Sequence, residues 1–152
     1  MDIGIISDTH GLVRPEVYPA FEGVDLILHA GDIGGSDVLI ELQPIAPVKA
    51  IAGNVDGDLM DRLGEALTLT LLQKTIHLRH VPWEIPDQKS TGPVREIFIC
   101  GHSHRPLNQQ AGENLYFNPG SAGPKRFDLP ISVGRIKIGK NQVTSEIIHL
   151  VS

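Results

Sequence analysis

The segment DIGIISDTHG, residues 2–11, contains the pattern that decides the fold. Its first half is a short apolar run, which is typical of a buried β-strand. A carboxylate and an imidazole, Asp8 and His10, follow where this strand is expected to end. Residues two apart in an extended chain point the same way, so both side chains can reach one centre.

Four later apolar runs end in the same kind of residue. The run at 25–30 leads into Asp32, and the run at 48–52 leads into Asn54 and Asp56. The run at 75–80 ends at His80, and the run at 96–100 leads into His102 and His104. The carboxyl ends of strands in an open α/β sheet share one edge, where ligands bind. We therefore expect these polar side chains to converge with Asp8 and His10.

Imidazole, carboxylate and amide groups are the ligands of a transition-metal site. A single Asp or His at a strand end is usually only a turn residue, but a succession of five such strands is poorly explained by chance. Leaving out Asp56, the set has seven members, too many for one tetrahedral zinc ion. The set suits two ions that share a bridging carboxylate.

The rest of the chain completes an α/β pattern. Further strands are expected at 67–72 and 114–118, with a hairpin over 132–151, and short helices at 14–21, 35–43 and 56–63. Asp56 is expected to cap the last helix. Because the first strands alternate with helices, they should be parallel neighbours. We predict a four-layer αββα sandwich of two mixed β-sheets flanked by helices, forming one domain over residues 1–152.

One segment lacks the helix expected between two apolar strands. Residues 81–95 contain three prolines and Gly92, and they carry the only tryptophan, Trp83. An irregular loop is therefore predicted. Its tryptophan is interpreted as a hydrophobic lid or a subunit contact, or alternatively as a ring that stacks on a nucleobase.

Composition narrows the class of protein. The net charge is −5 without any run of Lys or Arg, which argues against long nucleic acid as the main partner. The apolar runs are too short to span a bilayer, so no membrane association is expected. A single cysteine, Cys100, and a start without signal-peptide features predict a cytoplasmic protein. His29 is expected to pack beside the site, and His149 to lie near the surface.

The ordered motifs DTHG, GDIG, GNVDG, His80, GHSHRP and NPGS resemble the calcineurin-like metallophosphoesterase superfamily, in particular its small YfcE-type phosphodiesterase branch. The likeness runs from residue 2 to about 126. It implies the metallo-dependent phosphatase fold and a dinuclear metal site that hydrolyses small phosphodiesters. The ligand sets implied are Asp8, His10 and His104 for one ion, Asn54, His80 and His102 for the other, and Asp32 bridging both.

The same resemblance implies how the site works. A hydroxide activated by the two ions attacks phosphorus, with Asp32, Asn54 and His102 as the catalytic residues. Asp56 is expected to orient a neighbouring ligand without binding metal itself. Phosphate contacts are expected from Asn54, Ser121 and Arg126. Manganese is the expected ion, although iron, nickel, cobalt or zinc would suit the same ligands.

Two departures from the family pattern are visible. Many relatives place a general-acid histidine after the asparagine of the third motif, and here that position is Val55. Losing general-acid help costs on the order of 10²–10⁴ in rate, so we expect a preference for diesters with good leaving groups. In addition, Val81 and the Pro-rich loop replace a glycine and a helix. The less covered flank allows a homo-oligomer.

Two other functions are alternatives to this one. The fold is shared by a retromer subunit, so a non-catalytic metal-binding scaffold for protein–protein interaction is the main alternative. All seven ligand positions are filled here, which favours the phosphoric ester hydrolase. A serine hydrolase using Ser7 or Ser103 would need a G-x-S-x-G elbow, which the sequence lacks.

Overall fold

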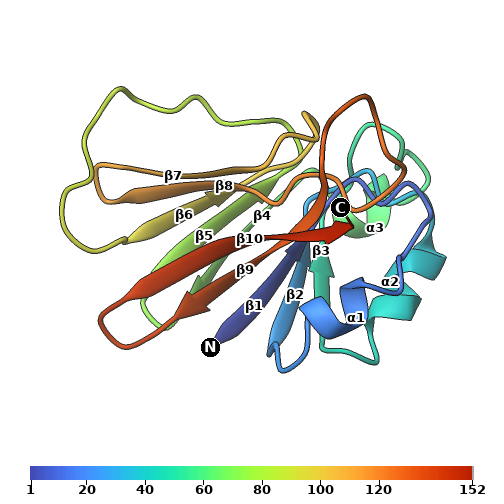
Figure 1. The fold of residues 1–152 in the computed structure, drawn as a ribbon, viewed down its shortest axis with the longest axis horizontal. Coiled ribbons are helices and arrows are strands. Elements are labelled where there is room, and N and C mark those ends of the chain that lie inside the picture. The colour runs from blue at the N-terminus through green and yellow to red at the C-terminus, as the bar shows by residue number, and fades with distance from the viewer. Residues whose placement is uncertain (152) are drawn as a thin grey trace.

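Two five-stranded β-sheets pack face to face in this computed structural model, which describes residues 1–151 (Figure 1). The first sheet has the order β10-β9-β1-β2-β3 and the second the order β4-β5-β6-β8-β7. The strands of the first sheet are β1 (Asp2–Ile6), β2 (Leu26–His29), β3 (Val48–Ala50), β9 (Ile131–Ile138) and β10 (Val143–Val151). Those of the second are β4 (Ala66–Leu71), β5 (Lys74–Arg79), β6 (Glu96–Ile99), β7 (Leu107–Ala111) and β8 (Asn114–Asn118).

The alternation of side chains along β1 divides the apolar residues between two cores. Ile3 and Ile5 face the second sheet, while Ile6 lies on the opposite side with the helices. The ring of Phe21 covers Gly4 of β1, where an added Cβ would come within 2.9 Å of the ring. A side chain at position 4 would therefore push the helical layer off the sheet.

Three short helices cover the first sheet. They are α1 (Val17–Ala20), α2 (Ser36–Leu42) and α3 (Met60–Leu63). Buried residues from the helical segments, such as Val17, Leu39 and Leu59, join one core cluster with Ile27 of β2. Within residues 1–151 the outer face of the second sheet carries no helix, and the loop over 81–95 runs beside it (Figure 1).

The predicted fold class is confirmed, with two mixed sheets and parallel pairing of β1, β2 and β3. The predicted flanking helices lie on the first sheet, and among residues 1–151 no helix forms a fourth layer on the second. The predicted strands are all present, and the segment 81–95 is irregular apart from a bridge at Ser90. Two helices are much shorter than predicted: α1 covers four residues of 14–21, and α3 begins only at Met60. Strand β7 was not predicted.

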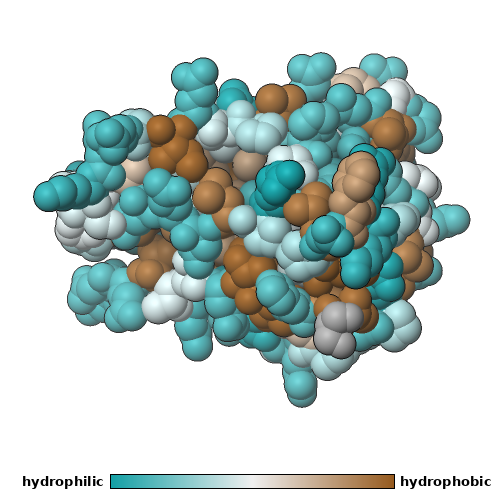
Figure 2. All heavy atoms as spheres, turned by 45° about the horizontal axis from the view of Figure 1, so that its top comes forward, coloured by the Kyte–Doolittle hydropathy of each residue, from teal (hydrophilic) through white to brown (hydrophobic). Residues whose placement is uncertain are grey.

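The pairing brings the loops after the parallel strands to one edge. β1 pairs with β2 and β2 with β3, and in the second sheet β5 pairs with β6, all in parallel. The five segments that follow these strands carry the predicted ligands. Figure 2 shows one face of the molecule, which is largely hydrophilic with separate hydrophobic patches.

No helix of the described chain is long and apolar enough to cross a membrane.

Candidate metal centre

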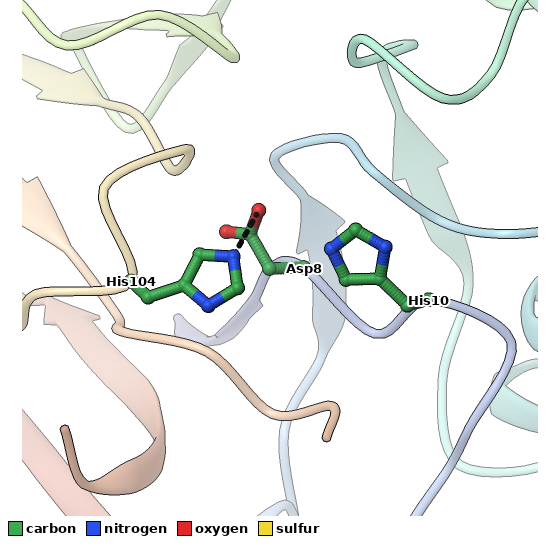
Figure 3. Close-up of side chains that lie close together, drawn as sticks. All are labelled: Asp8, His10 and His104. Atoms are coloured by element: carbon green, nitrogen blue, oxygen red, sulfur yellow. Dashed lines mark ion pairs between the residues drawn. The ribbon is translucent and has the colours of Figure 1, made fainter. Parts of the chain in front are cut away.

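The predicted ligands gather in two groups at this edge. Asp8, His10 and His104 form one group, and Asp32, His80 and His102 form the other, with the ligand atoms of each group within 4.8 Å of one another. Figure 3 shows His10 and His104 on either side of Asp8. The two sheets thus contribute to both groups.

Asp32 lies between the two groups. Its Oδ2 atom is 3.2 Å from His80 Nε2 and 3.8 Å from His10 Nε2. Asn54, on the loop after β3, lines a cavity together with His80. One carboxylate is therefore within reach of imidazoles from both groups, which is what a bridging ligand requires.

Unsatisfied buried atoms provide a test of whether these residues fit a cation. Among the described residues, five buried side-chain nitrogen or oxygen atoms have no hydrogen-bond partner, and four of them belong to predicted ligands. These four are Asp8 Oδ1, His10 Nε2, His80 Nε2 and His104 Nδ1. A buried polar atom without a partner costs about 1–3 kcal/mol. Four such atoms so close together indicate that a cation binds there. The donor set fits a metal ion.

Hydrogen bonds from its neighbours fix the orientation of the Asp8 carboxylate. The Ser7 hydroxyl donates to Oδ2 over 2.8 Å and the His102 backbone N–H over 3.2 Å. Oδ1 is left 3.3 Å from His104 Nε2. Burial raises the pKa of Asp8, and the Ser7 hydrogen bond opposes this. An added Cβ at Gly101 would collide with Ser7 Oγ, so the close approach of these loops requires glycine there.

The tautomer of His80 follows from its partner. Its Nδ1 lies 2.8 Å from the carbonyl oxygen of Ala30, which can only accept, so Nδ1 carries the proton. Nε2 therefore presents a lone pair toward Asp32, as a metal-binding imidazole does. Burial lowers the pKa of His104, and the positive charge of Arg126 adds to this, so the neutral form of the His104 ring is favoured.

The ligand loops adopt a strained backbone. Five predicted ligands have positive φ angles, namely Asp8 (56°), His10 (46°), Asp32 (55°), His102 (70°) and His104 (62°). Asp and His tolerate this region better than most residues, but it still costs roughly 1–2 kcal/mol per residue. Such strain persists only where the surrounding structure fixes it, and it is common at functional sites.

Asp56 joins the loops that carry Asp32 and Asn54. Its buried carboxylate accepts backbone N–H bonds from Ile33 (2.9 Å), Gly34 (3.0 Å) and Gly53 (2.9 Å). Burial raises the pKa of this carboxyl, but the three donors outweigh burial and hold it below its ordinary value. The prediction that Asp56 caps a helix is wrong, because the carboxylate is used by these loops.

His29 also links the ligand loops through hydrogen bonds. The ring is fully buried, its Nδ1 accepts from the Gly31 N–H over 3.1 Å, and its Nε2 lies 2.9 Å from Thr9 Oγ1. Thr9 in turn donates to the carbonyl of Ile33 over 2.8 Å. Burial lowers the pKa of His29 to about 3, so the ring is neutral with the proton on Nε2. This chain ties the loop after β1 to the loop after β2.

The expected phosphate-binding residues differ in their surroundings. Ser121 is buried, and its hydroxyl donates to the Asp8 backbone oxygen over 3.2 Å, so a phosphate contact would have to break that bond. Arg126 is exposed and close enough to influence His104. Asn118, the first residue of the NPGS motif, donates to the carbonyl of Gly101 over 3.0 Å. The Asn-Pro-Gly turn was the available signal for this contact.

A sequence profile of the calcineurin-like phosphoesterase superfamily domain matches residues 1–141. The chain belongs to this superfamily. A probable metallophosphoesterase of Methanothermobacter thermautotrophicus is 34% identical over 162 aligned positions, covering 98% of this chain and 92% of the relative. Another, from Methanocaldococcus jannaschii, is 30% identical over 155 positions, covering 85% and 72%.

Two of the solved structures with a fold similar to that of this chain are YfcE and Vps29. The E. coli phosphoesterase YfcE has a TM-score of 0.69 at 21% identity, over 99% of this chain and 100% of that one. Vps29 of Entamoeba histolytica in complex with zinc has a TM-score of 0.73 at 22% identity, with the same coverage. At these identities the likeness concerns the fold.

Proposed function

We propose that this superfamily member is a phosphodiesterase that uses two divalent metal ions, manganese first among them. One ion would be held by Asp8, His10 and His104, and the other by Asn54, His80 and His102. Asp32 would bridge them. The observation that carries this proposal is the cluster of unpartnered buried ligand atoms on both sides of Asp32. Superfamily membership and the names of the relatives support hydrolysis of phosphoric esters.

Two bound ions would neutralise the phosphoryl oxygens and lower the pKa of water toward neutrality. The protein's own contribution is to hold the ligands in place. Ser7 and the His102 N–H turn Asp8, the Ala30 carbonyl sets the His80 tautomer, and Asp56 fixes the loops of Asp32 and Asn54. These contacts reduce the reorganisation needed when charge develops on the phosphoryl group.

A diester substrate is favoured by the side chain that follows Asn54. Val55 is 52% exposed and has no proton to give to a leaving group, although its backbone N–H donates to Asp32 Oδ1 over 3.1 Å. Alcohols that leave without protonation are therefore favoured. Beside Asn54 and His80 lies a cavity of about 490 Å³ with apolar walls from Met60 and Val81. It offers room for an ester substituent.

The exposed guanidinium of Arg126 supplies positive charge next to His104 and is proposed to contact the phosphate. A small phosphodiester would need such a single contact rather than a basic stripe. We also propose that the protein is cytoplasmic and that it assembles into a homo-oligomer.

The experiment that tests the proposal compares bis-p-nitrophenyl phosphate with p-nitrophenyl phosphate. Protein stripped by a chelator is assayed before and after manganese is restored, beside an Asn54→Ala variant. The exposed Asn141→Ala is a matched control, because Asn141 lies in the turn between β9 and β10. Manganese-dependent cleavage of the diester, lost only in Asn54→Ala, supports the proposal. Equal or faster cleavage of the monoester contradicts it.

The alternative function is a metal-binding scaffold for protein–protein interaction. It is favoured by the Vps29 neighbours, of which the protein from Chaetomium thermophilum has a TM-score of 0.75 at 16% identity. The same experiment separates the two functions. Protein that binds manganese but cleaves neither ester would support the scaffold.

A further inference from the structure

A second cavity, of about 290 Å³, lies next to the loop that carries His102 and His104. We call it the Trp83 cavity. It is lined by Trp83, Phe98, Cys100, Ser103, Arg105 and Leu107, with further contributions from Tyr116 and its neighbours. Pocket volumes for drug-sized ligands begin at about 300 Å³, so this one suits a single ring system with a small substituent.

Three aromatic rings form its walls. The rings of Phe98 and Tyr116 are stacked at 5.1 Å with 12° between their planes, and Trp83 meets Phe98 edge-on at 5.0 Å and 72°. Flat walls that meet at a steep angle leave a slot for another flat group, because aromatic pairs prefer offset-stacked or edge-to-face contacts.

The position of Trp83 is fixed without a ligand. Its Nε1 donates to the carbonyl of Ile99 over 3.2 Å, and the guanidinium of Arg79 lies over the ring at 3.6 Å. A wall that is already ordered loses little entropy on binding, which favours affinity for a small ligand. Trp83 therefore acts as the lid of this sheet face and also as one wall of the cavity.

The polar groups that line the Trp83 cavity offer hydrogen-bond donors to a ligand. Ser103 Oγ accepts hydrogen bonds from Asn118 Nδ2 and the Arg105 N–H, both over 3.2 Å, so its own proton is available for an acceptor on a ligand. The Arg105 side chain is exposed beside it. The matching ligand is a planar ring with acceptor atoms on its edge.

We propose that the Trp83 cavity binds a nucleobase. The base can come from two sources, a nucleoside phosphodiester held at the metal centre or a free nucleoside. Ser103 lies between the predicted ligands His102 and His104, so cavity and metal centre share one short loop. The first source rests on the phosphodiesterase function proposed above, whereas binding of the base does not.

Binding is measured by the fluorescence of Trp83, which is the only tryptophan of the chain. Adenosine and thymidine are titrated into wild type, Leu107→Tyr and Gln109→Tyr. Leu107→Tyr fills the cavity, whereas Gln109 lies two residues further along β7, exposed and outside the cavity lining. We expect saturable quenching with a dissociation constant of about 1 mM or lower, lost in Leu107→Tyr and kept in Gln109→Tyr.

A second variant guards against misfolding of Leu107→Tyr. Arg105→Ala changes an exposed side chain and should weaken binding of adenosine by about tenfold through the lost charged donor. Absence of saturable quenching by either nucleoside in wild type would overturn the proposal. So would unchanged affinity in a folded Leu107→Tyr variant.

Turnover separates the two sources of the base. If the substrate carries it, Leu107→Tyr lowers kcat/KM for the p-nitrophenyl ester of thymidine monophosphate by about tenfold relative to bis-p-nitrophenyl phosphate. If a free nucleoside is the ligand, adenosine changes the rate on bis-p-nitrophenyl phosphate without competing with it. Quenching in a protein that cleaves neither ester would reject the phosphodiesterase and keep the base-binding cavity.

Discussion

Acidification should weaken this protein through His29. Burial holds the pKa of the folded ring at about 3, compared with an ordinary value of 6.5. Below pH 6.5, His29 therefore binds a proton in the unfolded chain but stays neutral in the folded chain. Because the unfolded state binds more protons, this contribution to the free energy of unfolding falls as the pH falls from 6.5 toward 3.

The size of the effect follows from the two pKa values. At about pH 4.5, roughly 2 units below the unfolded pKa, the loss is about 2.7 kcal/mol. Domains of this kind are stable by only about 5–15 kcal/mol. A loss of this size should lower Tm by roughly 5–10 °C in a chain of this length.

The assay is urea unfolding of chelator-treated protein, followed by circular dichroism, at about pH 7 and about pH 4.5. His29→Gln keeps an amide that can bond to Thr9 but cannot titrate. Its loss of stability on acidification should be about 2.7 kcal/mol smaller than that of wild type. The exposed His149→Gln is the matched control and should follow wild type. Equal losses in wild type and His29→Gln would show that His29 is not the source of the acid sensitivity.

Three further predictions concern the ligand loops. Ser7→Ala should weaken manganese binding by about tenfold or more in calorimetry, because Asp8 loses its orienting donor; the buried Ser132→Ala, which donates elsewhere, should leave that affinity unchanged. In metal-free protein, His102→Gly should melt about 2–4 °C above His102→Ala, because glycine accepts a φ of 70°; identical melting would argue against strain. Asp56→Asn should lose about 2–4 kcal/mol in urea unfolding, whereas the exposed Asp58→Asn should lose almost nothing.

The strands could be predicted because their signals are local. Short apolar runs bounded by Gly, Asp or Asn gave β1, β2 and β8 almost to the residue. β7 was missed because LNQQA has little apolar content, and it is a strand through its pairing with β8 at the sheet edge. The helix expected over 14–21 covers only Val17–Ala20, in a segment that also contains Pro15 and Pro19.

The ligand types could also be predicted, because each follows a strand and strand order places the loops at one edge. The supporting contacts could not. Ser7 donates to Asp8 at a place where Gly101, far along the chain, comes so close that an added Cβ would collide with Ser7 Oγ. Asp56 lies near a helix start in sequence, but its N–H partners come from two loops that meet only in the folded chain. The Trp83 cavity likewise depends on how a loop lies on a sheet face.

Both ligand groups are proposed to hold an ion, and turnover should require the pair. The most direct measurement titrates manganese into chelator-stripped protein, counting bound metal and bis-p-nitrophenyl phosphate cleavage in the same samples. Two binding equivalents are predicted, with cleavage appearing as the second equivalent binds. Full cleavage at one equivalent, or none with two equivalents bound, would rule out a dinuclear catalytic centre.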